Sequence, residues 1–340
     1  MRTIPKLVVL VAVAVHLVQR GRQTAPAAFE PVADGLYSLT EGWKPLPFLP
    51  LPGYPIAVYA VRDGSNWVLV DAGVPALASQ LLDALRALVP PTDKLAAIVL
   101  THAHPDHVGA LPQLLQAYPD VPVVAHAGEE PFLTGQKHYL PPTGLAARLA
   151  RWAGVAPETP IQVPTERLRL LEEPLMDFSA YGHEELVYIV SPGHSPGHIS
   201  LLHAPSRTML TGDVLSFIKP SMRRAREGDA ADKRVVGTFA GLTLSAQPHI
   251  ICSKPFCDEA KAATSFCLLA DAVQYDALLA SHDLAGGGRG GWTQDDLKAA
   301  AARMPRCQEL SRMAAEDSPE HDPGAEYEVE EEAAEEDEYE

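Results

Sequence analysis

The sequence predicts an α/β fold with reactive groups at strand ends, and three observations support this. Short apolar runs bounded by turn residues alternate with longer segments of helical spacing. One apolar run leads directly into a loop crowded with histidines, "THAHPDHVG". A strand, a tight turn, a second strand and an aspartate occur twice, as "IAVYAVRDGSNWVLVD" and as "ISLLHAPSRTMLTGD". With 340 residues, 46% hydrophobic and 21% charged, the chain is long enough for one large domain with a well-buried core.

The first half of the chain shows a hairpin followed by alternating helices and strands. "IAVYAV" and "WVLVDAG" flank "RDGSN", whose Asp-Gly pair tolerates the positive φ angles of a tight turn. Residues 75–89 have helical spacing and a proline at their start, so they are expected to form a helix. Three elements are expected after it: a strand over 96–100, a helix over 109–118 and a strand over 121–127.

The second half is less regular. Residues 128–183 are rich in Pro, Glu and Arg and have weak periodicity, which indicates an insertion over the core. From 185 to 213 the pattern predicts strand, loop, strand, turn and strand, and residues 216–234 are predicted to be a polar loop. The remaining expected elements are a strand in "PHIICSKP", a helix over 258–280 and, beyond the Gly-rich joint "GGGRGG", a small amphipathic helix over 293–314.

The histidine-rich loop follows a buried strand and precedes a helix, a position where catalytic groups gather on a rigid scaffold. His102 and His104 are two residues apart and point the same way if strand geometry persists. Pro105 stiffens the turn, and Gly109 lets the chain turn into the helix. A hydrogen-bonded polar loop would explain an isolated His-X-His pair. The longer His-X-His-X-Asp-His pattern favours a site for zinc or a neighbouring first-row metal.

Further ligand candidates stand at the ends of other elements. His194 lies in "SPGHSPGH" just past an apolar strand, Asp213 ends "TMLTGD", and His282 is expected at the end of the helix over 258–280. The complete set has seven members: His102, His104, Asp106, His107, His194, Asp213 and His282. Seven ligands are too many for one tetrahedral metal and suit two metals that share a carboxylate.

These motifs resemble those of the metallo-β-lactamase fold of hydrolases, over roughly residues 30–285. "THAHPDH" is similar to the family's HxHxDH motif, "PGHSPGH" to its third metal motif and "LTGD" to the motif of its bridging aspartate. The resemblance implies a four-layer αββα sandwich. It also implies a division of the ligands, with His102, His104 and His194 on a first metal, Asp106, His107 and His282 on a second, and Asp213 bridging both.

One motif departs from the common family pattern. Many members have Gly-His-Gly around the last ligand, whereas this chain has Ser-His-Asp around His282. A histidine followed by aspartate is similar to the N-acyl-homoserine lactonase branch, as is "PGHSPGHISLL". Asp71, in "VLVDAG", is expected to orient a ligand through a hydrogen bond rather than to bind metal.

The resemblance implies a hydrolase with two divalent metal ions, with Zn²⁺ expected ahead of iron or manganese. Two dications lower the pKa of a bridging water, which then attacks a carbonyl carbon. Asp106 is expected to be catalytic as well, by passing a proton to the leaving group. The expected substrate is a small-molecule ester, lactone or thioester, with lactonase-like and glyoxalase-II-like activities both open. The alternatives are a non-catalytic binding protein of this fold and a β-lactamase or nuclease-type member.

The formal charge of −17 argues against a nucleic-acid partner, because phosphate recognition requires a basic face. Much of this acidity lies near the C-terminus, which is predicted to be a disordered tail because its carboxylates repel one another. The expected organisation is an N-terminal extension over 1–29, a hydrolase domain over 30–285, the Gly-rich joint and a helix over 286–314, and the tail over 315–340. The oligomeric state is left open.

The four cysteines are Cys252, Cys257, Cys267 and Cys307. In a chain of this length we expect them to form neither a disulfide framework nor a paired zinc motif, so we expect reduced, mostly buried thiols and a cytoplasmic location. The apolar run Leu7–Val18 follows two cationic residues, as in a signal or targeting segment, although a buried first strand or helix explains it equally well. With 12 residues, this run is too short to span a bilayer, and no transmembrane segment is expected.

Overall fold

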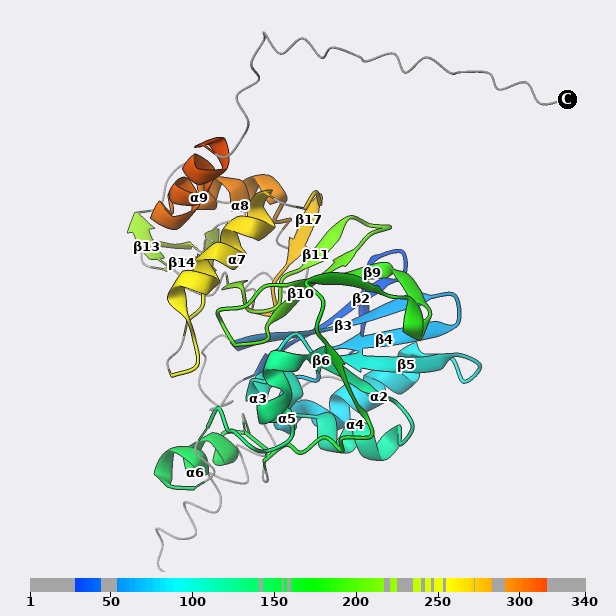
Figure 1. Cartoon of the computed structure of the whole chain (residues 1–340). Coiled ribbons are helices and arrows are strands. Elements are labelled where there is room, and N and C mark those ends of the chain that lie inside the picture. Colours follow the sequence, from blue (N-terminus) through cyan, green and yellow to red (C-terminus); the bar gives the residue numbers. More distant parts are fainter. Residues whose placement is uncertain are drawn as a thin grey trace, which may run out of the picture.

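Two β-sheets form the centre of the molecule (Figure 1). The computed structural model describes residues 28–43, 54–140, 143–154, 156–157, 160–216, 221–224, 235–239, 242–245, 248–252, 255–271, 273–282 and 291–316. Within these ranges, a seven-stranded sheet has the order β1-β2-β3-β4-β5-β6-β7, and a five-stranded sheet has the order β17-β11-β10-β9-β8. Smaller sheets of two and three strands, β12-β16 and β13-β15-β14, accompany them.

The seven-stranded sheet begins with antiparallel hairpins and continues with parallel strands. Its strands are β1 Glu30–Ala33, β2 Leu36–Trp43, β3 Tyr54–Asp63, β4 Asn66–Val70, β5 Lys94–Val99, β6 Val123–His126 and β7 Leu168–Leu171. The predicted hairpin is confirmed as β3 and β4, with Gly64 at a φ of +57° in its turn. Because parallel neighbours need crossover connections, helices lie between β4, β5 and β6 in the chain.

The five-stranded sheet is antiparallel except for its β11–β17 pair. Its strands are β8 Leu175–Phe178, β9 His183–Val190, β10 Ile199–His203, β11 Thr208–Leu210 and β17 Ala277–Leu279. β9, β10 and β11 confirm the three strands predicted over 185–213. The small sheets contain β12 Leu215–Ser216, β13 Ser221–Arg224, β14 Val235–Phe239, β15 Leu242–Ser245 and β16 His249–Ile250.

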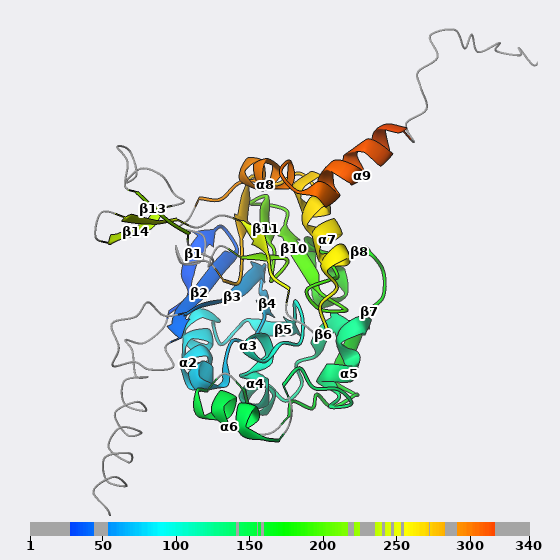
Figure 2. The same ribbon diagram turned by 90° about the vertical axis from the view of Figure 1, so that its left-hand side faces the viewer.

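Helices cover the outer faces of the two large sheets (Figure 2). The described α-helices are α2 Ala78–Leu88, α3 Pro105–Val108, α4 Leu111–Ala117, α5 Glu130–Leu133, α6 Leu145–Trp152, α7 Glu259–Asp271, α8 Gln294–Ala301 and α9 Pro305–Glu316. Short 3₁₀ turns are η1 Pro75–Leu77, η2 Ala127–Glu129 and η3 Ser179–Tyr181. The expected helix over 75–89 is confirmed by η1 and α2, and that over 109–118 by α4.

The αββα layering follows from three separate apolar cores. Trp67 and Leu69 of β4 pack in the core that includes α2 and α4, whereas Val68 and Val70 point to the opposite face. That opposite face meets the five-stranded sheet in a core between the sheets. A third core joins the outer face of the five-stranded sheet to α7, α8 and α9. Strand alternation therefore places one sheet against the other and each against helices, which confirms the predicted four-layer sandwich.

Several elements differ from their predictions. The helix expected over 258–280 ends at Asp271, and the apolar residues Ala277–Leu279 form β17 instead. The single helix expected over 293–314 is two helices, α8 and α9. The segment 128–183 is not simply an insertion, since it supplies β7 and β8 to the two main sheets. Part of the loop expected over 216–234 is strand β13.

The prediction of four free thiols is wrong. Cys252 is bonded to Cys257, and Cys267 to Cys307. The second bond joins α7 to α9 across the third core, at positions 40 residues apart in the chain. The fold brings these sulfur atoms together, and residue spacing carries no information about such a pairing. The cysteines therefore no longer support the expectation of a reducing compartment.

Two further predictions fall largely outside the described residues. The apolar run Leu7–Val18 lies in the undescribed range 1–27. Of the acidic tail predicted over 315–340, the structure describes residues 315 and 316, which end α9. Among the helices that the structure describes, none is long and apolar enough to cross a membrane.

Candidate metal centre

His102 and His104 lie in the loop that follows β5, as the strand-end prediction requires. His102 is fully buried and His104 half-buried. The facing atoms are His102 Nε2 and His104 Nδ1, which are 2.9 Å apart. The short helix α3 starts at Pro105, so the loop turns directly into a helical turn that carries Asp106 and His107.

His194 reaches the same point from the loop between β9 and β10. Its Nε2 atom is 2.8 Å from His104 Nδ1 and 3.2 Å from His102 Nε2. The five-stranded sheet thus supplies one imidazole and the seven-stranded sheet two. The three ring nitrogens converge although His194 lies about ninety positions from His102 and His104 in the chain.

Asp213 stands between two groups of side chains. It follows β11, and its Oδ2 atom is 3.4 Å from His194 Nε2 and 3.2 Å from His282 Nε2. Its Oδ1 atom is 3.5 Å from His107 Nε2. His282 Nε2 is also 3.4 Å from Asp106 Oδ2. One carboxylate therefore faces both groups, the arrangement expected of a shared ligand.

All seven predicted ligand residues are brought together. His102, His104, His194 and Asp213 form one group with ligand atoms within 4.8 Å of one another, and Asp106, His107 and His282 form a second. The element that carries His282 differs from the prediction, since it follows strand β17 rather than the end of a long helix. The parallel β11–β17 pair explains its position, because parallel neighbouring strands deliver Asp213 and His282 to the same sheet edge.

The donor set fits divalent metal ions. Zinc–nitrogen bonds of about 2.0–2.1 Å in a tetrahedral arrangement separate the ligand atoms by roughly 3.4 Å, comparable to the separations of the facing atoms here. Among the described residues, the buried atoms His107 Nε2 and Asp213 Oδ1 have no hydrogen-bond partner. Buried polar atoms without partners are costly, and a bound cation would satisfy both.

The second ring nitrogen of four histidines is occupied. His102 Nδ1 contacts Thr101 Oγ1 at 3.0 Å, and His107 Nδ1 contacts Asp71 Oδ2 at 2.8 Å. His194 Nδ1 donates to the Ile251 carbonyl at 3.0 Å, and His282 Nδ1 donates to the Pro55 carbonyl at 2.7 Å. Such outer partners fix ring orientation and leave Nε2 as the inward atom. Asp71 thereby holds the His107 ring in place.

Burial and charge divide the imidazoles into two kinds. Burial, with repulsion from His194, lowers the pKa of His104 to about 3. Burial and the neighbouring imidazoles also lower the pKa of His102. Burial opposes protonation of His107 and His282 too, but nearby carboxylates, above all Asp213, outweigh it and raise both pKa values. His102 and His104 therefore offer neutral nitrogen donors, the form that binds metal.

Glu129 has a role that sequence reasoning missed. This carboxylate is fully buried and lies between the two ligand loops. Its Oε2 atom accepts from the Ala103 N–H at 3.0 Å, and its Oε1 atom accepts from Ser195 Oγ and the Gly197 N–H, both at 2.7 Å. Nothing in "HAGEEP" distinguishes Glu129 from Glu130. The η2 turn approaches the second loop so closely that a Cβ on Gly197 would lie 2.8 Å from the Glu129 nitrogen.

Tyr139 is a second residue that the sequence did not indicate. Its hydroxyl donates to Glu129 Oε2 at 2.9 Å, and its ring meets the edge of the His104 ring with centroids 4.1 Å apart. Tyr139 also stacks on Phe132, with ring centroids 3.9 Å apart. Both aromatic residues line a pocket that reaches Ala103 and Pro105, the residues on either side of His104. A pocket with mainly apolar walls thus opens beside the metal-binding candidates.

Comparison with known proteins agrees with this geometry. A family model described as "Metallo-beta-lactamase superfamily" matches residues 51–236. The chain is 32% identical over 195 residues to the probable metallo-hydrolase YflN of Bacillus subtilis, a match that covers 57% of this chain and 68% of that protein. It is 29% identical over 199 residues to a hydroxyacylglutathione hydrolase of Synechococcus sp. (strain WH7803), covering 57% of this chain and 62% of that protein.

The fold has solved counterparts as well. A structure of the Cronobacter sakazakii metallo-beta-lactamase with a HARLDQ motif covers 89% of this chain and 100% of its own, with a TM-score of 0.50. The two sequences are 16% identical, so this likeness concerns the fold alone.

Proposed function

The chain belongs to the metallo-beta-lactamase superfamily, and on that premise we propose that it is a hydrolase with two divalent metal ions, Zn²⁺ by preference, that cleaves a thioester, ester or lactone. The observation that carries the proposal is the position of Asp213 between two groups of ligand atoms, with Oδ2 near His194 and His282 and Oδ1 near His107. In this assignment His102, His104 and His194 would hold one ion, and Asp106, His107 and His282 would hold the other. Asp213 would be available to both.

The metal pair supplies Lewis acidity, which lowers the pKa of water and polarises a carbonyl group. The protein's own contribution is to hold the ligand rings rigidly. Each outer contact, such as His107 Nδ1 with Asp71, removes a rotation that the ring would otherwise have. A nucleophile derived from water requires no Ser, Cys or Thr nucleophile and no covalent acyl intermediate.

Asp106 differs from the other proposed ligands because its side chain is 22% exposed. It follows Pro105, which lines the pocket beside His104. A carboxylate in this position can take a proton from the attacking water and pass it to the leaving group. We therefore assign Asp106 both a ligand role and a proton-transfer role.

The pocket beside His104 is the proposed substrate site. Phe132, Leu140 and Ile161 give it apolar walls, and Lys137 and Arg151 also line it. An apolar acyl or thiol group would be desolvated there while its carbonyl reaches the metal ligands. The similarity to a hydroxyacylglutathione hydrolase supports a thioester, while the Ser-His-Asp motif at His282 supports a lactone.

Elemental analysis of protein purified without chelators tests the proposal first. We expect about two equivalents of zinc, iron or manganese per chain, and loss of hydrolysis when a chelator removes them. A panel of acyl thioesters and acyl lactones then identifies the substrate class. One equivalent would exclude the two-metal assignment. No metal even after reconstitution, with no hydrolysis, would overturn the proposal in favour of a binding protein of the same fold.

A further inference from the structure

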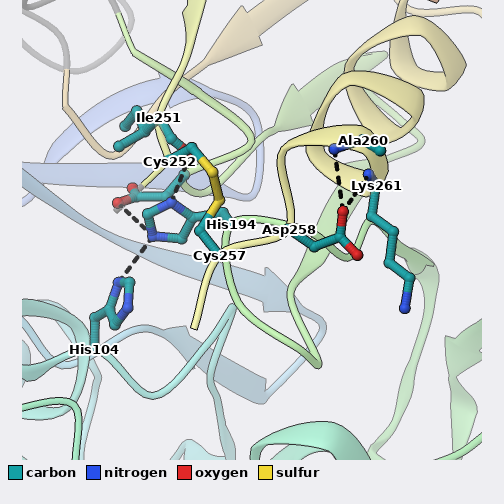
Figure 3. The surroundings of a disulfide bond; sticks show 9 residues. His104, His194, Ile251, Cys252, Cys257, Asp258, Ala260 and Lys261 are labelled. Atoms are coloured by element: carbon teal, nitrogen blue, oxygen red, sulfur yellow. Dashed lines mark hydrogen bonds and ion pairs between the residues drawn. A yellow bond between two sulfur atoms is a disulfide. The ribbon is translucent and has the colours of Figure 1, made fainter. Parts of the chain in front are cut away.

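The loop that carries His194 is held by a segment that the mechanism does not use. Figure 3 shows the two ends of this segment, Ile251 and Cys252 at one end and Cys257 and Asp258 at the other. The Ile251 carbonyl accepts from His194 Nδ1 at 3.0 Å. The Asp258 N–H donates to the Gly193 carbonyl at 2.8 Å, directly before His194 in the chain. Two points of the segment therefore fix one ligand loop.

The Cys252–Cys257 disulfide connects these two points. Its first cysteine directly follows Ile251, and its second directly precedes Asp258. Figure 3 shows the disulfide beside the His194 ring, while His194 and His104 point toward one another. The covalent bond thus lies next to a proposed metal ligand, although neither sulfur atom belongs to either group of ligand atoms.

The two ends of the segment are anchored differently. Asp258 is firmly placed at the start of α7, where its Oδ1 atom accepts from the N–H groups of Ala260 and Lys261, both at 3.1 Å. α7 also packs so closely on the ligand loop that a Cβ on Gly193, whose φ is +131°, would lie 2.0 Å from the Ala262 nitrogen. Ile251, in contrast, is half-buried and follows β16, a strand of two residues paired with β12.

We propose that the Cys252–Cys257 disulfide positions His194 by tying the Ile251 carbonyl to the rigid start of α7. With that carbonyl fixed, His194 Nδ1 keeps its hydrogen bond to it and Nε2 faces His102, His104 and Asp213. Without the bond, the carbonyl depends on a two-residue strand, and the His194 ring gains freedom to turn. This inference rests on the proposed function, since it assigns a supporting group to the same metal centre.

The second disulfide provides a matched control. Cys267–Cys307 joins α7 to α9 in the outer core, and neither cysteine adjoins Ile251 or Asp258 in the chain. Both bonds restrain the unfolded chain and so both contribute to stability. The positioning role predicts that only the first bond affects metal binding.

The experiment compares Cys252→Ser/Cys257→Ser with Cys267→Ser/Cys307→Ser by chelator competition and by the absorption spectrum of the Co²⁺-substituted protein. We expect the first double variant to bind one of its two metal ions about 10-fold or more weakly, with a changed Co²⁺ spectrum. The control should keep the affinities and the spectrum of the unchanged protein even where its thermal midpoint falls.

Equal metal affinities in both double variants would overturn the positioning role while leaving the proposed function intact. Absence of metal binding by the unchanged protein would instead overturn the proposed function and this inference together. If the first double variant does not fold, the unchanged protein is treated with a phosphine reductant, which is oxidised to the phosphine oxide with oxygen from water as the S–S bond becomes two thiols. Mass spectrometry after alkylation identifies the bond that opened, and retained metal affinity with Cys252–Cys257 open would refute the proposal.

Discussion

The buried Glu129 carboxylate offers the sharpest test of how the two ligand loops are held. Glu129→Gln keeps the shape of the side chain but replaces one acceptor oxygen with an NH₂ donor. Oε2 accepts from the Ala103 N–H and the Tyr139 hydroxyl, and Oε1 accepts from the Ser195 hydroxyl and the Gly197 N–H. Whichever way the amide turns, one backbone N–H faces another donor, because only the hydroxyl groups can reverse their roles.

The magnitude follows from this count. One buried N–H without a partner costs about 1–3 kcal/mol, and the bonds that remain to a neutral oxygen are weaker than those to a carboxylate by about 1 kcal/mol. We therefore expect the free energy of unfolding of the metal-free protein to fall by about 2–4 kcal/mol. The loops that carry His104 and His194 should also be held less firmly relative to one another, which lowers metal affinity about 10-fold.

Urea denaturation and chelator competition measure the two effects. Glu130→Gln is the control, because the neighbouring carboxylate makes no hydrogen bond or ion pair with the residues that the structure describes. It should change stability by less than about 0.5 kcal/mol. If Glu129→Gln and Glu130→Gln unfold at the same urea concentration and bind metal equally well, Glu129 does not join the loops as we argue.

Three further predictions concern other groups. Asp213→Ala should reduce metal content and turnover together. The loss of metal affinity and activity should exceed the roughly 10- to 100-fold loss that follows removal of an outer hydrogen-bond partner. Unchanged metal stoichiometry in elemental analysis would exclude a shared ligand. Asp106→Asn should lower kcat about 100-fold or more for a thioester or ester with a poor leaving group and less for one with a good leaving group; an equal loss for both would remove its proton-transfer role. Burial, helped by His203, lowers the pKa of His183, so the unfolded state binds more protons than the folded state just below pH 6.5. Stability should therefore fall as pH drops from 7 to 5, and His183→Gln should flatten this dependence in urea titrations; an unchanged slope would refute the assignment.

The candidate ligand residues and the α/β alternation could be predicted from the sequence because both depend on local patterns, whereas the four-layer sandwich was implied by the resemblance of the motifs to a known family. Apolar runs ending at His102, His194 and Asp213 identify strand ends, and strand ends of one sheet meet at one edge. The position of His282 could not be predicted in the same way. Helical spacing continues from α7 toward Ala280, and a three-residue strand such as β17 leaves no periodic signal against it. The pairing of β17 with β11, which is a tertiary contact, decides its conformation.

The orientations of the histidine rings could not be predicted from the sequence either. The partners of the outer nitrogens are a hydroxyl, a carboxylate and two carbonyls, and the two carbonyls belong to Pro55 and Ile251. Main-chain carbonyls occur at every position, so no residue type marks these two. They lie up to 227 positions from the histidine they hold, and only the packed sandwich brings them within reach. Substitutions that shift these strands without touching a ligand should therefore weaken metal binding, because the proposed centre depends on the relative position of the two sheets as much as on its seven ligands.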